Sequence, residues 1–149
     1  MPTMIRTTDE SDFGVVFQLL QQLWPDIKLN QLGLKTTLLN TINSPTDLAL
    51  CAWRDNKVVG FIAGSKVIDY WHAGYICHVS TLVVDVEHRG NSVGTDLLDA
   101  AKKWAYEENC QAIELDSAFY REKAHAFYDK NGFEKRAFTF SLDLTNCIE

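Results

Sequence analysis

TLVVDVEHRGNSVGTDLLDAAKKWAYEE, residues 81–108, begins as a strand and ends as a helix. Its first four residues have the β-branched and apolar character of a strand end. From Val93 to about Glu108, apolar residues recur every three or four positions, as on one face of an amphipathic helix. Residues 85–94, DVEHRGNSVG, form a loop that runs into the helix start. A strand–loop–helix unit in the middle of the chain predicts an α/β fold.

The loop has the composition of an anion-binding site. A helix start leaves up to about four backbone N–H groups unpaired and carries about half a positive charge. Gly90 and Gly94 remove Cβ atoms where the chain must turn tightly or a ligand must approach, and Asn91 tolerates a left-handed conformation. Hydroxyl and guanidinium donors complete the set: Ser92, Thr95 and Arg89.

Two common phosphate-binding loops do not match this sequence. The Walker A loop has four residues between its glycines and then Lys and Ser or Thr. Here three residues separate Gly90 from Gly94, and Thr-Asp follows. The dinucleotide pattern GxGxxG is also absent.

Two segments resemble motifs of the GNAT superfamily, the GCN5-related N-acetyltransferases. RGNSVG at 89–94 resembles the family's R/Q-x-x-G-x-G/A cofactor loop, with Ser92 where the family usually has Gly. REKAHAFYDKNGF at 121–133 resembles the later A-x-x-F-Y-x-x-x-G-F element. On the loop alone, a plain glycine-containing turn would be an equal interpretation. The second motif, in the right order, favours the family.

The resemblance implies a GNAT-like fold (an acyl-CoA N-acyltransferase fold) over nearly the whole chain, with acetyl-CoA as co-substrate. The loop would bind its diphosphate through backbone amides, and the strand end would pair with the pantetheine arm like a missing strand. The implied cofactor-binding residues are Leu82, Val83, Val84, Arg89, Gly90, Asn91, Ser92, Val93, Gly94 and Thr95.

The remaining patterns predict strands and helices in an order typical of a layered α/β (α+β) fold. Asp55-Asn56 is a two-residue hairpin turn, and Gly60 and Gly64 indicate a bulge or a close approach within the following strand. We therefore expect one domain, 1–149, with a mixed, mostly antiparallel sheet of six to seven strands flanked by helices. The expected strands are 4–7, 48–54, 57–68, 74–84, 111–117, 133–136 and 138–144, and the expected helices are 12–23, 31–43, 93–108 and 121–130.

Composition excludes several classes of protein. The chain has 149 residues, and its net charge of 14 − 20 = −6 comes without a Lys/Arg run, which disfavours nucleic-acid binding. Its apolar runs are shorter than the about 20 residues of a membrane helix, and its N-terminus lacks an apolar signal segment, so a cytoplasmic location is expected. The four cysteines lack zinc-site spacing, which predicts reduced structural thiols and no metal site: Cys51, Cys77, Cys110 and Cys147.

Tyr128 is the candidate proton donor, because acyl transfer from a thioester leaves a thiolate that benefits from a proton. It matches the Tyr of the family's F-Y element. Helical spacing separates it from Phe127, so Phe127 can be buried while Tyr128 faces a cleft. A core aromatic with a satisfied hydroxyl is the alternative interpretation.

The base that takes the proton of the amine is less clearly marked. Many members of the superfamily carry Glu or Asp on the strand before the loop, where this chain has Ser80 and Thr81. His78 is the candidate, placed on the same strand face as Ser80 and Leu82 by period-two alternation. Asp116, a water chain, or a substrate amine already partly neutral are alternatives.

These observations predict an enzyme that acetylates a primary amine of a small molecule or of a peptide or protein by direct attack on the thioester. A non-catalytic acyl-CoA-binding module or sensor, and a structural domain with a degenerate site, are the alternatives. Tyr70-Trp71-His72 lies at a predicted hairpin tip and is compatible with an acceptor pocket, a core cover or a dimer contact, and a homodimer stays open.

Overall fold

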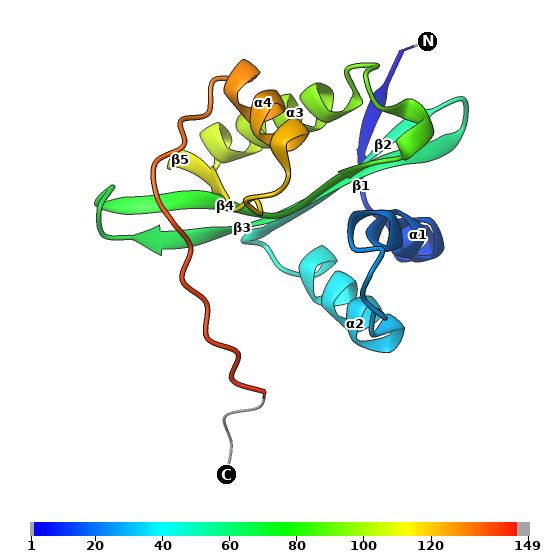
Figure 1. Cartoon of the computed structure of the whole chain (residues 1–149), viewed down its shortest axis with the longest axis horizontal. Helices are drawn as coiled ribbons and strands as arrows, with labels where there is room; N and C mark the ends of the chain where they lie inside the picture. Colours follow the sequence, from blue (N-terminus) through cyan, green and yellow to red (C-terminus); the bar gives the residue numbers. More distant parts are fainter. Residues whose placement is uncertain (1, 146–149) are drawn as a thin grey trace. The chain divides into compact units, whose positions relative to one another are not determined.

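The computed structural model describes residues 2–145, which divide into two compact units, one ending at Leu115 and one beginning at Asp116. Figure 1 shows the helices and strands along the chain. The first unit contains β1 (Met4–Thr7), η1 (Glu10–Asp12), α1 (Phe13–Leu23), α2 (Gln31–Ile42), β2 (Asp47–Arg54), β3 (Lys57–Asp69), β4 (Gly74–Val84), η2 (Val86–His88), α3 (Val93–Glu107) and β5 (Cys110–Leu115). The second contains α4 (Glu122–Lys130).

The sheet of the first unit has five strands in the order β1-β2-β3-β4-β5. Each neighbouring pair is antiparallel except β4 and β5, which are parallel. Asp55 and Asn56 both have positive φ, 49° and 62°, so they form the primed type of turn that suits a two-residue hairpin. The predicted hairpin and the mixed, mostly antiparallel sheet are confirmed.

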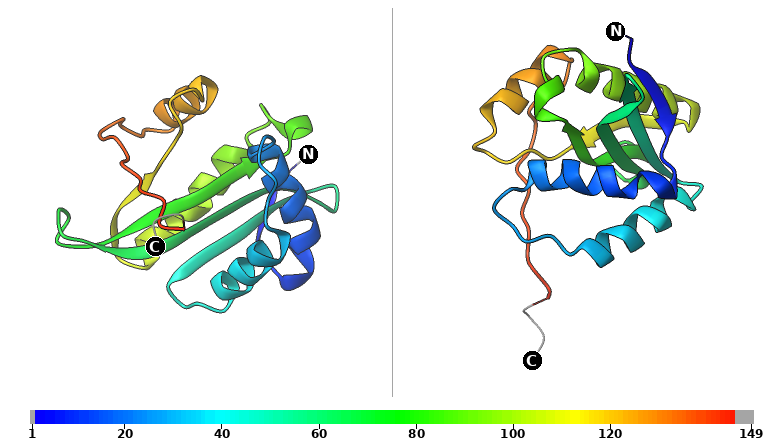
Figure 2. Two further views of the ribbon diagram at one scale, coloured as in Figure 1. Left: turned by 60° about the horizontal axis from the view of Figure 1, so that its bottom comes forward. Right: turned by 90° about the vertical axis from the view of Figure 1, so that its right-hand side faces the viewer.

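Helices cover both faces of this sheet, as Figure 2 shows. On one face, α1 and α2 pack a cluster against the central strands. On the other face, α3 buries Val93, Leu97 and Leu98, which are at most 1% exposed. The cluster on the α1 and α2 face includes Phe13, Val16, Leu19, Leu20, Leu38, Cys51, Phe61 and Val83. None of the helices within residues 2–145 has the length and apolar character needed to cross a bilayer.

Gly60 lies at a close approach between elements, and Gly64 lies beside a β-bulge. A Cβ on Gly60 would lie 2.9 Å from Leu97 Cδ1 and 3.0 Å from Val93 Cγ1, so α3 approaches β3 closely there. Gly64 adjoins a register shift, because Ala63 pairs with Thr81 while Gly64 pairs with Val79. Ser80 is therefore the extra residue of a β-bulge in β4.

The two strands expected at 133–136 and 138–144 are wrong, and the sheet has five strands in place of the six to seven predicted. Apolar residues do alternate over the second segment, but Phe138, Phe140, Leu142 and Leu144 are all at least 67% exposed. Alternation predicts which side chains would share a buried face, but a strand also needs a backbone partner, which the pattern does not specify.

Several boundaries differ by one or two residues. The strand expected at 111–117 is β5, Cys110–Leu115, and the helix expected from 121 begins at Glu122 because Arg121 is its N-cap residue. Asp9 caps the short η1 turn before α1: its carboxylate accepts from the Ser11 N–H, and its own N–H donates to Asp12.

The second unit is built around α4. His125 Nε2 lies 2.9 Å from the carbonyl oxygen of Ala118, which ties the incoming segment to the helix. At the other end, Gly132 has φ of 88° and the Phe133 N–H donates to the Tyr128 carbonyl at 3.0 Å. Gly132 thus supplies the left-handed residue at which α4 ends.

Candidate functional site

The loop between β4 and α3 turns at two left-handed residues. Gly90 has φ of 82° and Ser92 has φ of 67°, and α3 begins directly after at Val93. Asn91, which was expected to tolerate this conformation, is not left-handed. Because Ser92 has a Cβ, this conformation costs about 1 kcal/mol of backbone strain, which glycine would not have. The conformation explains why glycine suits this position.

The start of α3 presents backbone N–H groups without a side-chain cap. Ser92 is the N-cap residue but makes no capping hydrogen bond, and the first bond of the helix runs from the Asp96 N–H to the Ser92 carbonyl at 2.9 Å. A Cβ on Gly90 would meet nothing within 4 Å, so the space before the helix is open. Uncapped donors at the positive end of a helix dipole fit an anion with several acceptor oxygens.

The end of β4 leaves one backbone edge without a strand. β5 pairs with β4 only as far as Val79 and Leu115, whereas β3 continues to pair with β4 up to Val84. Within residues 2–145, the stretch from Ser80 to Val84 therefore has a strand on one side only. An extended ligand carrying amide groups fits such an edge.

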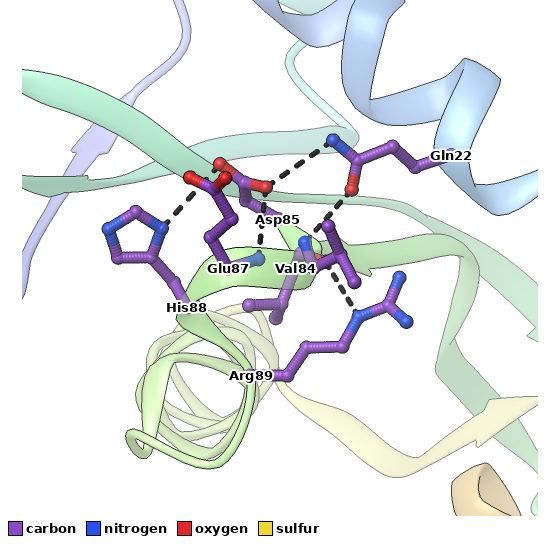
Figure 3. A network of polar contacts seen from close by, with 7 residues as sticks. Gln22, Val84, Asp85, Glu87, His88 and Arg89 are labelled. Atoms are coloured by element: carbon purple, nitrogen blue, oxygen red, sulfur yellow. Dashed lines mark hydrogen bonds and ion pairs between the residues drawn. The ribbon is translucent and has the colours of Figure 1, made fainter.

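Gln22, in the last turn of α1, contacts the start of the loop through both ends of its amide (Figure 3). Its Oε1 accepts from the Val86 N–H at 2.9 Å, and its Nε2 donates to Asp85 Oδ1 at 3.4 Å. The Asp85 N–H in turn donates to the Val59 carbonyl at 2.8 Å. The loop start is therefore held by both a helix and a strand.

Asp85 and Arg89 organise the rest of the loop start. Asp85 accepts from the Glu87 N–H at 3.3 Å, which caps η2, and its Oδ2 lies 3.5 Å from His88 Nδ1. Arg89 Nε donates to the Val84 carbonyl at 3.1 Å. The Arg89 guanidinium thus lies at the end of β4, and within residues 2–145 its Nε is the nitrogen that makes a hydrogen bond.

Arg54, the last residue of β2, contacts the loop from another side. Its Nη2 donates to the Asn91 carbonyl at 2.9 Å, and its Nε donates to Thr3 Oγ1 at 2.9 Å. The sequence did not indicate Gln22 or Arg54 as neighbours of the loop. They lie 64 and 37 positions from their backbone partners, and no local pattern records such a contact.

The bulge at Ser80 corrects the placement of His78. Leu82 pairs with Ile62, while His78 pairs with Ser65. Because Ile62 and Ser65 are three residues apart on one strand, their side chains lie on opposite faces. His78 is therefore on the face opposite Leu82, contrary to the uninterrupted alternation. It is half-buried and lies between Ser65 and Glu114 in register.

Tyr128 is half-buried in the second unit, between two aromatic rings. The ring centroids of Phe127 and Phe133 lie 5.5 Å and 5.8 Å from its own, both edge-on. Phe127 is half-buried as well, so Phe127 and Tyr128 differ less in burial than the helical spacing predicted. Burial raises the pKa of the Tyr128 phenol, and the nearby Arg121 partly opposes this. The phenol therefore keeps its proton at neutral pH.

Other candidate residues have definite surroundings. Asp116 is exposed and accepts from Thr139 Oγ1 at 2.8 Å. Tyr70 and Trp71 are 93% and 80% exposed, which excludes the core-cover interpretation for this tip. Beside them, Asp69 accepts from the His72 N–H at 3.1 Å and from its ring. The carboxylate of Asp69 is thus engaged within its own hairpin.

Comparison with known proteins gives several matches. The sequence profile described as "Acetyltransferase (GNAT) family" matches residues 15–133. The aminoalkylphosphonate N-acetyltransferase of Salmonella typhimurium is 26% identical over 140 residues, which are 93% of this chain and 88% of that protein.

Solved structures share the fold. The aminoglycoside N-acetyltransferase AAC(6')-Iy, in complex with CoA, superposes with a TM-score of 0.85 at 18% identity, covering 96% of this chain and 95% of that one. The aminoglycoside 6'-N-acetyltransferase AAC(6')-Ih from Acinetobacter baumannii gives 0.80 at 21% identity, covering 96% and 99%. At these identities the likeness concerns the fold alone. The fold agrees with the profile match, which spans both motifs of the sequence, and the chain belongs to the acetyltransferase (GNAT) family.

Proposed function

We propose that this chain acetylates the primary amine of a small molecule, with residues 89–95 holding the diphosphate of acetyl-CoA. The chain is an acetyl-CoA-dependent N-acetyltransferase by its family. The observation that carries the assignment of the loop is the uncapped N-terminus of α3, preceded by the left-handed Gly90 and Ser92. Bound there, acetyl-CoA supplies an acyl group activated as a thioester.

The loop residues have separate roles in this proposal. The backbone N–H groups at the start of α3, from Val93 to Thr95, donate to the diphosphate oxygens. Arg89 adds a charge-assisted donor, while its Nε stays on the Val84 carbonyl. Gly90 leaves the space that the diphosphate occupies.

The end of β4 receives the pantetheine arm. Leu82, Val83 and Val84 offer backbone groups along an edge where β5 no longer pairs. An amide-bearing arm laid along this edge makes main-chain hydrogen bonds as an added strand does. The pantetheine arm would then run along β4 from the cofactor loop toward the bulge at Ser80.

Tyr128 is the proposed proton donor to the leaving sulfur. The support is its match to the family's F-Y element and its buried phenol, whose raised pKa keeps it protonated through neutral pH. A phenol that stays protonated can donate to the thiolate as the C–S bond breaks.

His78 is the proposed base for the attacking amine. It is the imidazole on β4, two residues before the bulge, and imidazole is suited to accept a proton near neutrality. Asp116 is the alternative. The variants His78→Asn and Asp116→Asn distinguish them, because loss of the base moves the acid limb of the profile of kcat/KM against pH. An unchanged profile in His78→Asn removes His78.

The acceptor is proposed to be a small molecule because the Salmonella relative, which covers 93% of this chain, is named for aminoalkylphosphonate acetylation. We propose that both units form one catalytic domain over 1–149, since the family match runs across their boundary. Free thiols at Cys51, Cys77 and Cys110 suit the reducing cytoplasm, the proposed location.

An amine panel tests this function. The purified chain is incubated with acetyl-CoA and, separately, aminoalkylphosphonates, aminoglycosides, polyamines, amino acids and a lysine-containing peptide. Released CoA thiol and the mass of the acetylated acceptor are measured. Acetylation of a small amine supports the proposal. Acetylation of the peptide alone contradicts the acceptor class, and CoA binding without acetyl transfer to any amine contradicts the catalytic assignment.

A further inference from the structure

We propose that Gln22 is a positioning residue for the cofactor loop, acting through Asp85 and Val86. The inference rests on the proposed role of residues 89–95 in holding acetyl-CoA. Gln22 belongs to α1, outside the segment that carries the cofactor motif, and it contacts the loop at the point where the chain leaves β4 (Figure 3).

The chemistry of the contact fixes the orientation of the amide. Val86 offers an N–H, which needs an acceptor, and Asp85 offers a carboxylate oxygen, which needs a donor. Only a side chain with both groups satisfies the two at once. Gln22 does so with Oε1 at 2.9 Å from the Val86 nitrogen and Nε2 at 3.4 Å from Asp85 Oδ1. Neither glutamate nor methionine can supply this pair of contacts near neutral pH.

Gln22 is not part of the packed face of α1. The buried residues of the helix are Phe13, Val16, Leu19 and Leu20, whereas Gln22 is exposed. An exposed glutamine adds little to helix packing and costs side-chain entropy when it is held in one conformation. Its contribution therefore falls on the loop it holds.

The contact also gives the Asp85 carboxylate a hydrogen-bond donor. A carboxylate at the entrance of an anion-binding loop repels the anion. Here Gln22 Nε2 donates to Asp85 Oδ1, the oxygen that also accepts from the Glu87 N–H, so the carboxylate is directed at these two partners. Holding the loop start before the ligand arrives lowers the ordering cost of binding.

The first experiment measures the Kd of CoA, and the KM of acetyl-CoA and kcat, in Gln22→Met. We expect the Kd and KM to rise on the order of tenfold, with kcat changed less than threefold. Gln21→Met is the matched control, because Gln21 is the adjacent exposed glutamine of the same helix. Its Kd should equal that of the wild type. Thermal unfolding of both variants should match the wild type, since neither residue is buried.

A residue exchange tests the pairing itself at pH 8. Gln22→Glu places two carboxylates in contact and should weaken CoA binding more than Gln22→Met does. Gln22→Glu with Asp85→Asn restores one carboxylate and one amide across the contact, although the amide nitrogen then faces the Glu87 N–H that Asp85 Oδ1 accepted. The double variant should therefore bind CoA more tightly than Gln22→Glu, with a Kd within about threefold of that of Asp85→Asn alone, which carries the same loss at Glu87. The nearby ionisable side chains, Glu87, His88 and Arg89, are the same in every variant.

The outcomes separate this inference from the function it rests on. If wild-type protein binds no CoA, the proposed loop function fails, and with it this inference. If wild-type protein binds CoA and Gln22→Met binds it equally well, the positioning role is overturned while the loop assignment stands. If Gln22→Glu is weak and the double variant binds CoA no better than Gln22→Glu and worse than Asp85→Asn alone, the pairing of Gln22 with Asp85 is overturned.

Discussion

Arg54 Nη2 donates to the Asn91 carbonyl over 2.9 Å, which joins the end of β2 to the middle of the cofactor loop. The same guanidinium uses Nε to bind Thr3, so its plane is fixed by two contacts on different segments. Asn91 precedes the left-handed Ser92, and its carbonyl belongs to the peptide unit that turns the chain into α3. Arg54 therefore orients the peptide immediately before the uncapped helix start.

Replacing Arg54 should loosen the loop more than the fold. We expect Arg54→Met to raise the Kd of CoA on the order of tenfold, because two charge-assisted hydrogen bonds are lost. Arg54→Lys retains a cation with fewer donors and should give an intermediate Kd. Lys57→Met, across the same hairpin turn, removes an equal charge and serves as control. Equal losses in Arg54→Met and Lys57→Met would mean that long-range charge, not the contact, sets the affinity.

Ser92 gives a second prediction, because its φ of 67° is one that glycine adopts freely. Ser92→Gly should retain or improve CoA binding and change the free energy of unfolding by less than about 1 kcal/mol, since relief of strain offsets the added chain entropy. Ser92→Val should lower stability by about 1 kcal/mol or more and weaken CoA binding about tenfold. Calorimetric unfolding and CoA titration measure both. Binding that weakens in the Gly variant would contradict the role of the backbone at this position.

The Ser92 case shows what the sequence predicts and what it leaves out. The spacing of Gly90 and Gly94 before an amphipathic run located the loop and α3 correctly, because both features are local in the chain. The pattern did not reveal that Ser92, not Asn91, takes the left-handed turn, because asparagine is the residue type that favours this conformation and local propensity therefore indicated Asn91. Backbone conformation inside the loop depends on contacts such as that of Arg54.

Longer-range features were less predictable for the same reason. Alternation along β4 placed His78 on the face of Leu82, but one extra residue at Ser80 reverses the relation. Gln22 reaches the loop across 64 positions, and a single exposed glutamine in a helix gives no signal of its partner. The alternating residues from Phe138 to Leu144 predicted a strand, but they remain exposed. Each error concerns a contact with a residue far along the chain, which a local sequence pattern does not predict.

Tyr128→Phe tests the proton donor. Removing the hydroxyl should lower kcat by about 10²- to 10⁴-fold, the usual contribution of general acid catalysis, while the Kd of CoA changes little. Because burial raises the pKa of this phenol, the donor keeps its proton beyond neutrality, and the wild-type kcat should not fall between about pH 7 and 9 through loss of this proton. Phe127→Leu, the adjacent aromatic, is the control for packing. A kcat within threefold of the wild type in Tyr128→Phe would exclude the role.

The buried thiols predict a limited reactivity. Burial raises the pKa of both Cys51 and Cys77 to about 11, against an ordinary value of 9.0. Both side chains are fully buried, whereas Cys110 is half-buried. At about pH 8 only about one in a thousand of the Cys51 and Cys77 thiols is ionised. Alkylation followed by peptide mapping should therefore modify Cys110 before Cys51 or Cys77. Labelling of the three at equal rates in the native protein would contradict their burial.

The same shifts set the sign of a pH dependence of stability. Between pH 9 and 11 the unfolded chain releases these protons first, because its thiols ionise near 9.0 and the folded ones only at about 11. The free energy of unfolding therefore falls as the pH rises through this window, by about 2 kcal/mol per thiol at pH 11. Urea unfolding of the wild type and Cys51→Ala, compared at several pH values, measures the difference. The variant should lose less stability than the wild type as pH rises, and parallel losses would contradict the assignment to Cys51.

Gly60 links the packing of α3 to the site at its start. A Cβ at this position would lie 2.9 Å from Leu97 and 3.0 Å from Val93, both at most 1% exposed, and 3.3 Å from the backbone oxygen of Val83. Gly60→Ala should therefore cost about 1–3 kcal/mol of unfolding free energy through overpacking.

Because Val93 is the first residue of α3, displacing it moves the N–H groups that the diphosphate requires, so CoA binding should weaken in Gly60→Ala along with stability. Gly14→Ala is the matched variant: a Cβ there meets nothing within 4 Å, and alanine favours the helix by about 0.5–1 kcal/mol. It should raise the unfolding free energy and leave the Kd unchanged. Chemical denaturation and CoA titration of the two variants separate general stability from loop position. A Gly60→Ala protein that is less stable but binds CoA as the wild type does would show that α3 can shift without moving its N-terminus.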